Sequence, residues 1–295
     1  MFSIFGVPAP LLFGQLLLGL INGGFYAMLS LGLAVIFGML NIINFAHGAM
    51  FMMGAFVAWM LLNYLGINYW FALLLAPLIV GAFGFVLEKT IISRLYALDH
   101  LYGLLLTFGL ALVLEGLFRN GYGSSGMPYQ IPTILSGAVN LGFMFLPIYR
   151  GWVIIAALVV CVATWLLIEK TKLGSLLRAA TENPALVQAF GVNVPRLVTL
   201  TFAGGVALAA FAGVLAAPIY SVNPNMGSNF INTVFAVVVI GGMGSIFGAI
   251  VSGFGLGVIE GLTKVFYPQA SDTVIFVVMV LVLLTRPAGL FGKAA

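Results

Sequence analysis

The chain has 295 residues, of which 63% are hydrophobic and only 6% are charged. A mean hydropathy of +1.21 excludes a water-soluble globular protein, because most of the surface of such a protein must meet water. The formal net charge of +4 comes from basic residues scattered along the chain, which basic cytoplasmic loops explain better than nucleic-acid binding does. We therefore expect contact with membrane lipid and no nucleic-acid partner.

Two long blocks contain no Asp, Glu, Lys or Arg. They are residues 1–87 and residues 197–259. A helix needs roughly 20 apolar residues to cross a hydrocarbon core about 30 Å thick. Each block is therefore long enough for several crossings.

The apolar runs predict an all-α, polytopic helix bundle with about eight to nine membrane segments, some of them broken or re-entrant. No composition shift marks a separate soluble domain, so residues 1–295 are expected to form a single transmembrane domain. A short apolar run, 231–240, precedes the break GGMGS. The other predicted helices lie near 11–31, 34–62, 69–87, 101–118, 152–168, 197–217, 246–263 and 273–285.

The early block is interrupted by polar residues in the stretch FGMLNIINFAHGAMF, at Asn41, Asn44 and His47. Lipid offers no hydrogen-bond partners, so such side chains must face protein or a wet cavity. We expect these three residues on a translocation pathway. His47 has two interpretations: a proton carrier near neutral pH, or a histidine hydrogen-bonded to a neighbouring helix.

Two polar connections differ in character. Residues 119–150 include GYGSSGMPYQIP and predict an irregular surface loop. Residues 169–196 are charged and predict a folded element, with a short helix that starts at Pro184 and ends at Gly191. Glu182 is expected in the first turn of that helix.

Basic residues predict the orientation, since cytoplasmic loops are enriched in Lys and Arg. Eight of the eleven fall in three segments that we place in the cytoplasm: Lys89 and Arg94; Lys170, Lys172, Arg178 and Arg196; Arg286 and Lys293. An even number of crossings must then separate Arg196 from Arg286. This requires the 231–240 run to cross or dip into the membrane, with a break at the glycines of GGMGS. We expect Gly241, Gly242 and Gly244 to allow close approach there.

No enzymatic motif is present. The chain has no GxxxxGK[ST], no HExxH, no cluster of Cys and His, and no paired carboxylates within one span. We expect no catalytic residue and no metal site. The i, i+4 pairs Glu115–Arg119 and Glu260–Lys264 read best as ion pairs at helix ends.

Several stretches resemble permeases of ABC importers, and most closely the branched-chain amino acid type (LivH/LivM). They are INGGFYAMLSLGLAVIFGMLNIINFAHGAMFMMGAF, LGSLLRAATENPALVQAFGV, IGGMGSIFGAIVSGFGLGVIEGL and RPAGLFG. The similarity runs in order over residues 11–292. One departure is Phe247, where the family often has proline.

The resemblance implies a permease of a bacterial inner membrane, without an ATPase site or cofactor of its own. It implies ATP-binding partners: two cytoplasmic ATPase subunits that dock on the 169–196 loop. A second permease (LivM-like, or a copy of this chain) and an extracytoplasmic substrate-binding protein would complete the importer. For the ATPase contact we select Arg178, Glu182, Pro184 and Gly191.

A rival hypothesis is a self-sufficient channel or ion-coupled carrier for small polar solutes. It predicts transport without ATP and leaves the folded 169–196 loop unexplained. Branched-chain amino acids are the substrates that the resemblance favours, with other amino acids, urea, amides or aromatic acids as alternatives. A membrane-embedded enzyme is disfavoured because no catalytic cluster exists.

Overall fold

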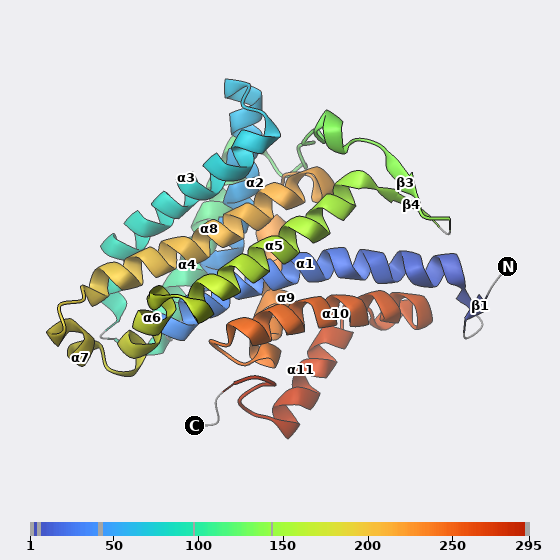
Figure 1. The fold of residues 1–295 in the computed structure, drawn as a ribbon. Coiled ribbons are helices and arrows are strands. Elements are labelled where there is room, and N and C mark those ends of the chain that lie inside the picture. Colours follow the sequence, from blue (N-terminus) through green and yellow to red (C-terminus); the bar gives the residue numbers. More distant parts are fainter. Residues whose placement is uncertain (1–2, 5–6, 41–43, 97, 143, 293–295) are drawn as a thin grey trace. The chain divides into compact units, whose positions relative to one another are not determined.

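A computed structural model describes residues 3–4, 7–40, 44–96, 98–142 and 144–292, and most of them are helical (Figure 1). Within the described residues, seven helices are long and apolar enough to cross a membrane. Two shorter apolar helices follow α8, so the prediction of a polytopic all-α bundle is confirmed. The long helices are α1 (Ala9–Leu40), α2 (Ala46–Leu65), α3 (Tyr69–Thr90), α4 (His100–Tyr122), α5 (Ile148–Lys170), α8 (Val194–Tyr220) and α10 (Ile246–Phe266), and the short ones are α9 (Met226–Gly241) and α11 (Val274–Thr285).

The remaining elements are small. Two short helices connect α5 to α8, namely α6 (Lys172–Glu182) and α7 (Pro184–Ala189). The 119–150 connection is more ordered than expected, because it holds an antiparallel hairpin in which Val139 pairs with Leu146. The other elements are β1 (Ser3–Ile4), β2 (Val7–Pro8), β3 (Ala138–Asn140), β4 (Phe145–Pro147), and the single 3₁₀ turns η1 (Ile92–Leu95), η2 (Thr133–Leu135) and η3 (Pro268–Ala270).

One predicted boundary is wrong. The helices expected near 11–31 and 34–62 are not divided between residues 31 and 34, since α1 continues to Leu40 and α2 begins only at Ala46. A Cβ built on Gly32 would lie 2.8 Å from the backbone oxygen of Gly205 on α8. The glycine therefore allows two helix backbones to approach closely. Asn44 and Phe45, which directly precede α2, lie outside a helix.

The chain divides into two compact units. The first unit contains the described parts of Met1–Ser30, Gln130–Cys161 and Thr233–Ala295, and the second unit contains those of Leu31–Tyr129 and Val162–Asn232. The boundary falls within α1, α5 and α9, so each of these helices contributes to both units.

In the first unit, α10 packs antiparallel to the first part of α1. A Cβ on Gly257 would lie 2.3 Å from the backbone oxygen of Gly19, so the two backbones touch. Beside this contact, the buried Glu260 carboxylate accepts a hydrogen bond of 2.7 Å from Tyr26 and forms an ion pair with Lys264. The expected Glu260–Lys264 pair is therefore confirmed, and it joins a network that includes the α1 side chain of Tyr26.

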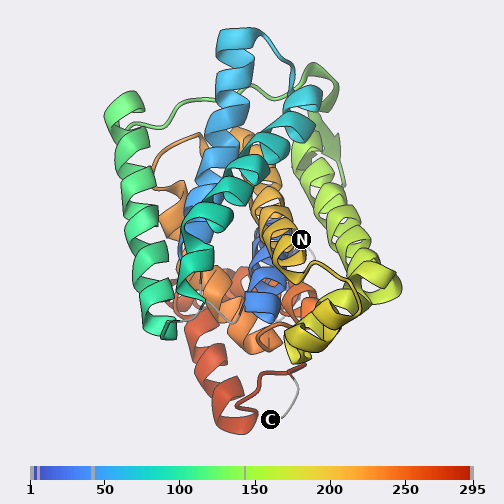
Figure 2. The ribbon, with the colours of Figure 1, turned by 90° about the vertical axis from the view of Figure 1, so that its left-hand side faces the viewer.

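In the second unit, α2, α3 and α8 pack against one another and α4 lies against α2 (Figure 2). The core is lined by small and apolar side chains, including Phe51 and Phe56 on α2 and Phe202 on α8. At the far end of α4, Arg119 donates a hydrogen bond of 2.6 Å to the Asn225 side chain. This unit carries both the 169–196 loop and a pocket of about 800 Å³.

Candidate functional site

The short helices between α5 and α8 form because the sequence supplies their start and stop signals. The Asn183 side chain accepts a hydrogen bond of 3.0 Å from the backbone of Leu186, which caps α7, and Pro184 occupies its first turn. The Asn193 side chain caps α8 in the same way, through a 3.0 Å bond from the backbone of Arg196. Between them Gly191 has φ +84°, a left-handed conformation that ends α7 as expected.

A small apolar core holds these helices on the start of α8. Its buried members are Leu177 and Ala180 from α6, Val187 from α7, and Val194 and Leu197 from α8. Only one α7 side chain is therefore buried. The 169–196 loop is therefore a packed element rather than a loose connector, and α7 shares its small core with the first turns of α8.

The outer side of α7 carries two exposed apolar side chains. Leu186 is 54% exposed and Phe190 is 80% exposed, four residues apart on one helical face. Apolar side chains at this spacing are the anchors by which a short helix seats in a groove of another protein.

The four residues selected for the ATPase contact lie in this region, with two different local roles. Pro184 and Gly191 bound α7 as predicted, and both are exposed. Arg178 instead forms an ion pair of 3.0 Å with Glu169, which ties α6 to the end of α5. The expectation for Glu182 is wrong: it is the last residue of α6, because Asn183 caps α7 and places Pro184 at its first position.

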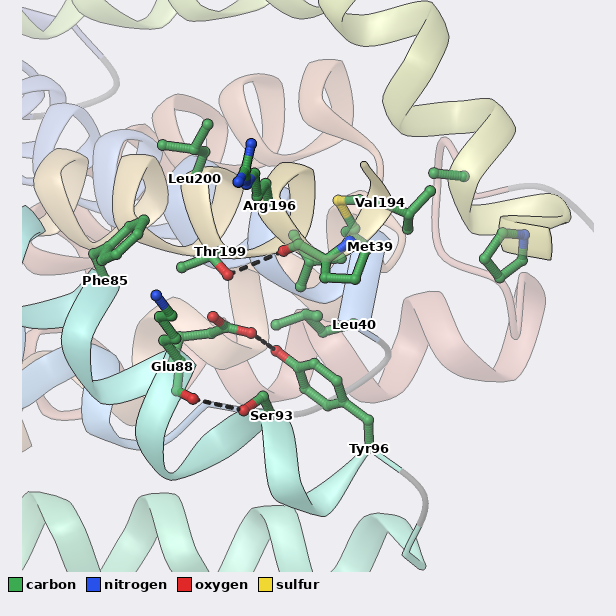
Figure 3. A pocket seen from close by; sticks show the side chains of 15 residues that line it. Met39, Leu40, Phe85, Glu88, Ser93, Tyr96, Val194, Arg196, Thr199 and Leu200 are labelled. Atoms are coloured by element: carbon green, nitrogen blue, oxygen red, sulfur yellow. Dashed lines mark hydrogen bonds between the residues drawn. The ribbon is translucent and has the colours of Figure 1, made fainter. Parts of the chain in front are cut away.

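A pocket of about 800 Å³ lies at the same end of the second unit, where α1, α3, α7 and α8 meet (Figure 3). Small-molecule sites typically have volumes of about 300–1,000 Å³ and combine apolar walls with a few polar groups. Met39, Leu40, Phe85, Val198 and Leu200 supply apolar wall here. The polar and remaining lining residues are Glu88, Lys89, Ser93, Tyr96, Ala180, Pro184, Val194, Pro195, Arg196 and Thr199.

The electrostatics of this pocket centre on Glu88, which is 1% exposed. Its Oε1 accepts a hydrogen bond of 2.5 Å from the Tyr96 hydroxyl, while Oε2 has no hydrogen-bond partner among the described residues. Burial, the hydrogen bond to Glu88 and the negative charge of that carboxylate all raise the pKa of Tyr96, which keeps its hydroxyl protonated as a donor. Two cationic residues, Lys89 and Arg196, also line the pocket and are exposed to solvent.

The first group of pathway candidates lies in the second unit. Asn41 falls outside the described residues. Asn44 is 2% exposed, and neither polar atom of its side chain has a hydrogen-bond partner among the described residues. His47 is fully buried at the start of α2, and its ring lies about 3 Å from where a Cβ on Gly32 would be. Asn44 and His47 are joined by a backbone hydrogen bond of 3.2 Å.

The second group of candidates, the GGMGS glycines, lies in the first unit. The predicted break is present, because α9 ends at Gly241 and α10 begins at Ile246. Gly242 and Gly244 have φ +98° and +83°, which glycine adopts at little cost. A Cβ on Gly242 would lie 2.4 Å from the backbone nitrogen of Gly292, so the turn packs on the RPAGLFG segment. Among the described residues, these glycines thus shape a turn and contact other backbone rather than polar side chains.

Comparison with known proteins decides the family. The family model described as "Branched-chain amino acid transport system / permease component" matches residues 15–283. The chain belongs to this family. The permease is 33% identical to the high-affinity branched-chain amino acid transport system permease protein BraD of Pseudomonas aeruginosa, over 95% of each chain.

Two further relatives are similar over most of the permease. LivH of Escherichia coli K12, a high-affinity branched-chain amino acid transport system permease protein, is 29% identical over 95% of each chain. LivM of the same organism, a protein with the same description, is 26% identical over 90% of the permease and 67% of its own length. No solved structure matches the permease. The family places it among multi-pass membrane proteins and agrees with the helices described above.

Two features of the permease were missed by sequence reasoning. Glu88 was treated only as the residue that ends a charge-free block, and its neighbours Lys89 and Arg94 were used only for orientation. The available signal for this site was a carboxylate just inside the end of a predicted span, Glu88, with a tyrosine, Tyr96, eight residues later. Leu186 and Phe190 were also overlooked, although two large apolar residues four apart in a polar connection indicate an exposed helical contact face.

Within the described residues, no group of three or more His, Cys, Asp or Glu could hold a metal ion.

Proposed function

We propose that this permease is the membrane-spanning subunit of an ABC importer that carries branched-chain amino acids across a bacterial inner membrane. Family membership and the functions for which BraD and LivH are named support the substrate class. In this proposal ATP is bound and hydrolysed by separate subunits, and the permease itself needs no cofactor.

The observation that carries the proposal is the construction of α7. Val187 anchors it in the small core, while Leu186 and Phe190 project from the exposed side. A rigid helix with an outward apolar face suits a groove on a moving partner, and the shared core transmits that movement to α8. We propose residues 169–196 as the coupling loop, with Pro184 and Gly191 fixing the length of α7, Arg178 bracing α6, and Glu182 offering a contact charge.

Partners complete the proposal. Similarity to both LivH and LivM over most of the chain supports pairing with a second, similar permease, either LivM-like or another copy. Two cytoplasmic ATPase subunits would dock on the two coupling loops. An extracytoplasmic binding protein would deliver the amino acid from the other side.

For the pathway we propose Asn44 and His47, together with Asn41. A buried amide without hydrogen-bond partners costs free energy unless a passing solute or water satisfies it. For the glycines 241, 242 and 244 we propose a separate role, which is to permit close packing of the broken segment between α9 and α10.

Reconstitution tests this function. The permease, its second permease and two ATPase subunits are placed in proteoliposomes, and uptake of radiolabelled leucine is followed with the binding protein outside and ATP inside. We expect uptake only when all components and ATP are present, and no ATP hydrolysis by the permease alone. Uptake by the lone permease without ATP would favour the channel or carrier instead.

A further inference from the structure

The pocket at the start of α8 contains a carboxylate oxygen that the described protein does not satisfy. Glu88 is 1% exposed, and its Oε2 has no hydrogen-bond partner among the described residues. Figure 3 shows the carboxylate directed into the pocket between Tyr96 and Thr199. A buried carboxylate is costly unless it is paired or hydrogen-bonded, and the Tyr96 hydroxyl occupies only one of its two oxygens. The Oε2 atom of Glu88 can therefore accept a hydrogen bond from an N–H donor, and a cationic donor would bind it most strongly.

Neighbouring side chains do not supply that donor. The Thr199 hydroxyl donates to the Pro195 backbone oxygen at 3.0 Å, and Ser93 donates to the Lys89 backbone oxygen at 3.0 Å. Lys89 lies over the Phe85 ring, with its nitrogen 6.0 Å from the ring centre. Each of these groups already has an interaction of its own, so the open Glu88 oxygen is available to a bound molecule.

The other residues that line the pocket indicate which further groups the bound molecule carries. Lys89 and Arg196 are exposed residues that line the pocket and suit an anionic group near its mouth. Phe85, Val198 and Leu200 offer apolar contact. We infer that this pocket binds a zwitterion through its primary ammonium group on Glu88, with its anionic group near Arg196 and Lys89 and its apolar part on the wall.

Two sources share this chemistry. One is a free α-amino acid with an apolar side chain, which the proposed function would release on the side of the coupling loop. The other is the ethanolamine headgroup of a phospholipid, whose phosphate and acyl chains would take the remaining surfaces. The amino acid deepens the proposed function and rests on it, because the pocket is also lined by Ala180 and Pro184 of the coupling loop.

The experiment measures equilibrium binding of radiolabelled leucine to the purified full chain in nanodiscs of phosphatidylcholine, whose quaternary ammonium has no N–H donor. We expect saturable binding that Glu88→Gln weakens by about tenfold to a hundredfold, the usual effect of losing a hydrogen bond to a charged group. Gln keeps the size of the side chain and an acceptor for Tyr96. Arg196→Gln should also weaken binding, while the exposed substitutions Asp272→Asn and Arg94→Gln, outside the pocket lining, should not.

Analogues and lipids separate the sources. Leucine should be displaced by neither 4-methylpentanoic acid, which lacks the amine, nor 3-methylbutylamine, which lacks the carboxylate. Phosphatidylethanolamine that binds in a Glu88-dependent way, or displaces leucine, would identify the lipid as a source of the same zwitterion. If neither leucine nor phosphatidylethanolamine binds more tightly to the wild type than to a monodisperse Glu88→Gln variant, the inference is overturned. ATP-driven uptake, measured separately, distinguishes the binding pocket from the proposed importer function. Uptake without Glu88-dependent binding would contradict only the binding pocket. Glu88-dependent binding without uptake would contradict only the importer function.

Discussion

At the scale of single residues, glycines decide how closely the helices of the second unit can pack. Gly213 on α8 faces α2, and a Cβ there would lie 2.0 Å from the backbone oxygen of Phe51. Gly54 on α2 meets α8 in the same way, 2.2 Å from the backbone oxygen of Ala210. No flexible side chain can move aside at either contact. In a membrane, where apolar side chains gain nothing by leaving lipid, such close backbone approach is a main source of helix association.

We therefore expect Gly213→Ala to destabilise the permease. The added methyl group must push α2 and α8 apart, at a cost of about 1–3 kcal/mol. Gly204→Ala on the same helix is the matched control, because a Cβ there meets nothing within 4 Å. Thermal unfolding in detergent should show a lower Tm for Gly213→Ala and an unchanged or higher Tm for Gly204→Ala. Equal Tm values for the two variants would contradict this account of the packing.

Gly191 poses a different problem, because space is not limiting. A Cβ there meets nothing within 4 Å, and only the left-handed φ of +84° disfavours a side chain. We expect Gly191→Val to cost about 1–2 kcal/mol locally and Gly191→Asn to cost much less, since asparagine tolerates this conformation. Amide hydrogen exchange over α7 and the first turn of α8 should rise in the valine variant only. Similar exchange in both variants would show that steric bulk, not backbone conformation, matters at this position.

At the scale of elements, α7 has one buried anchor and an exposed apolar pair. The exposed side chain of Phe190 does not stabilise the isolated permease, so Phe190→Ser should leave its Tm unchanged. In the reconstituted importer, we expect the same variant to lower substrate-stimulated ATPase activity and uptake at least severalfold, because a seated apolar anchor contributes about 1 kcal/mol or more to a contact.

The matched control is Phe145→Ser, which removes another phenylalanine of similar exposure, 69% against 80%, from the hairpin between α4 and α5. That hairpin is expected on the opposite side of the membrane, away from the ATPases. ATPase activity should therefore stay normal in this variant. Equal losses in both variants would point to a general effect of exposed phenylalanine, and normal activity in Phe190→Ser would remove α7 as the docking helix.

At the scale of the whole chain, the spans could be predicted because each long helix contains an apolar window of 18 residues with at most two charged residues. Capping residues such as Asn183, Pro184 and Gly191 act locally, so α7 could also be predicted from its sequence. The expected division between residues 31 and 34 is wrong because the whole run is apolar, and its composition does not show where one helix ends and the next begins. The Glu88 pocket could not be predicted, because α1, α3, α7 and α8 line it with residues up to about 160 positions apart. A single sequence does not show which of these distant residues lie together in the fold.

Orientation is the whole-chain property that remains a prediction, and it rests on the distribution of Lys and Arg. Of the apolar helices from α8 to α11, α8 and α10 are long enough to cross a membrane, while α9 and α11 are shorter. The positive-inside rule requires an even number of crossings between Arg196 and Arg286. We expect residues 169–196 in the cytoplasm and the 120–149 loop outside. Single cysteines at the exposed positions Ser175 and Ser125 test this directly.

Both cysteines should be placed in a Cys161→Ala background, although Cys161 is fully buried and should itself react little. In intact cells, an impermeant maleimide should label the Ser125→Cys variant only. After the membrane is opened, both variants should label, because neither position is covered by the rest of the chain. Labelling of both variants in intact cells would place the two loops on one side. α7 and the Glu88 pocket would then face away from any cytoplasmic ATPase, and the coupling proposal would fall with the topology.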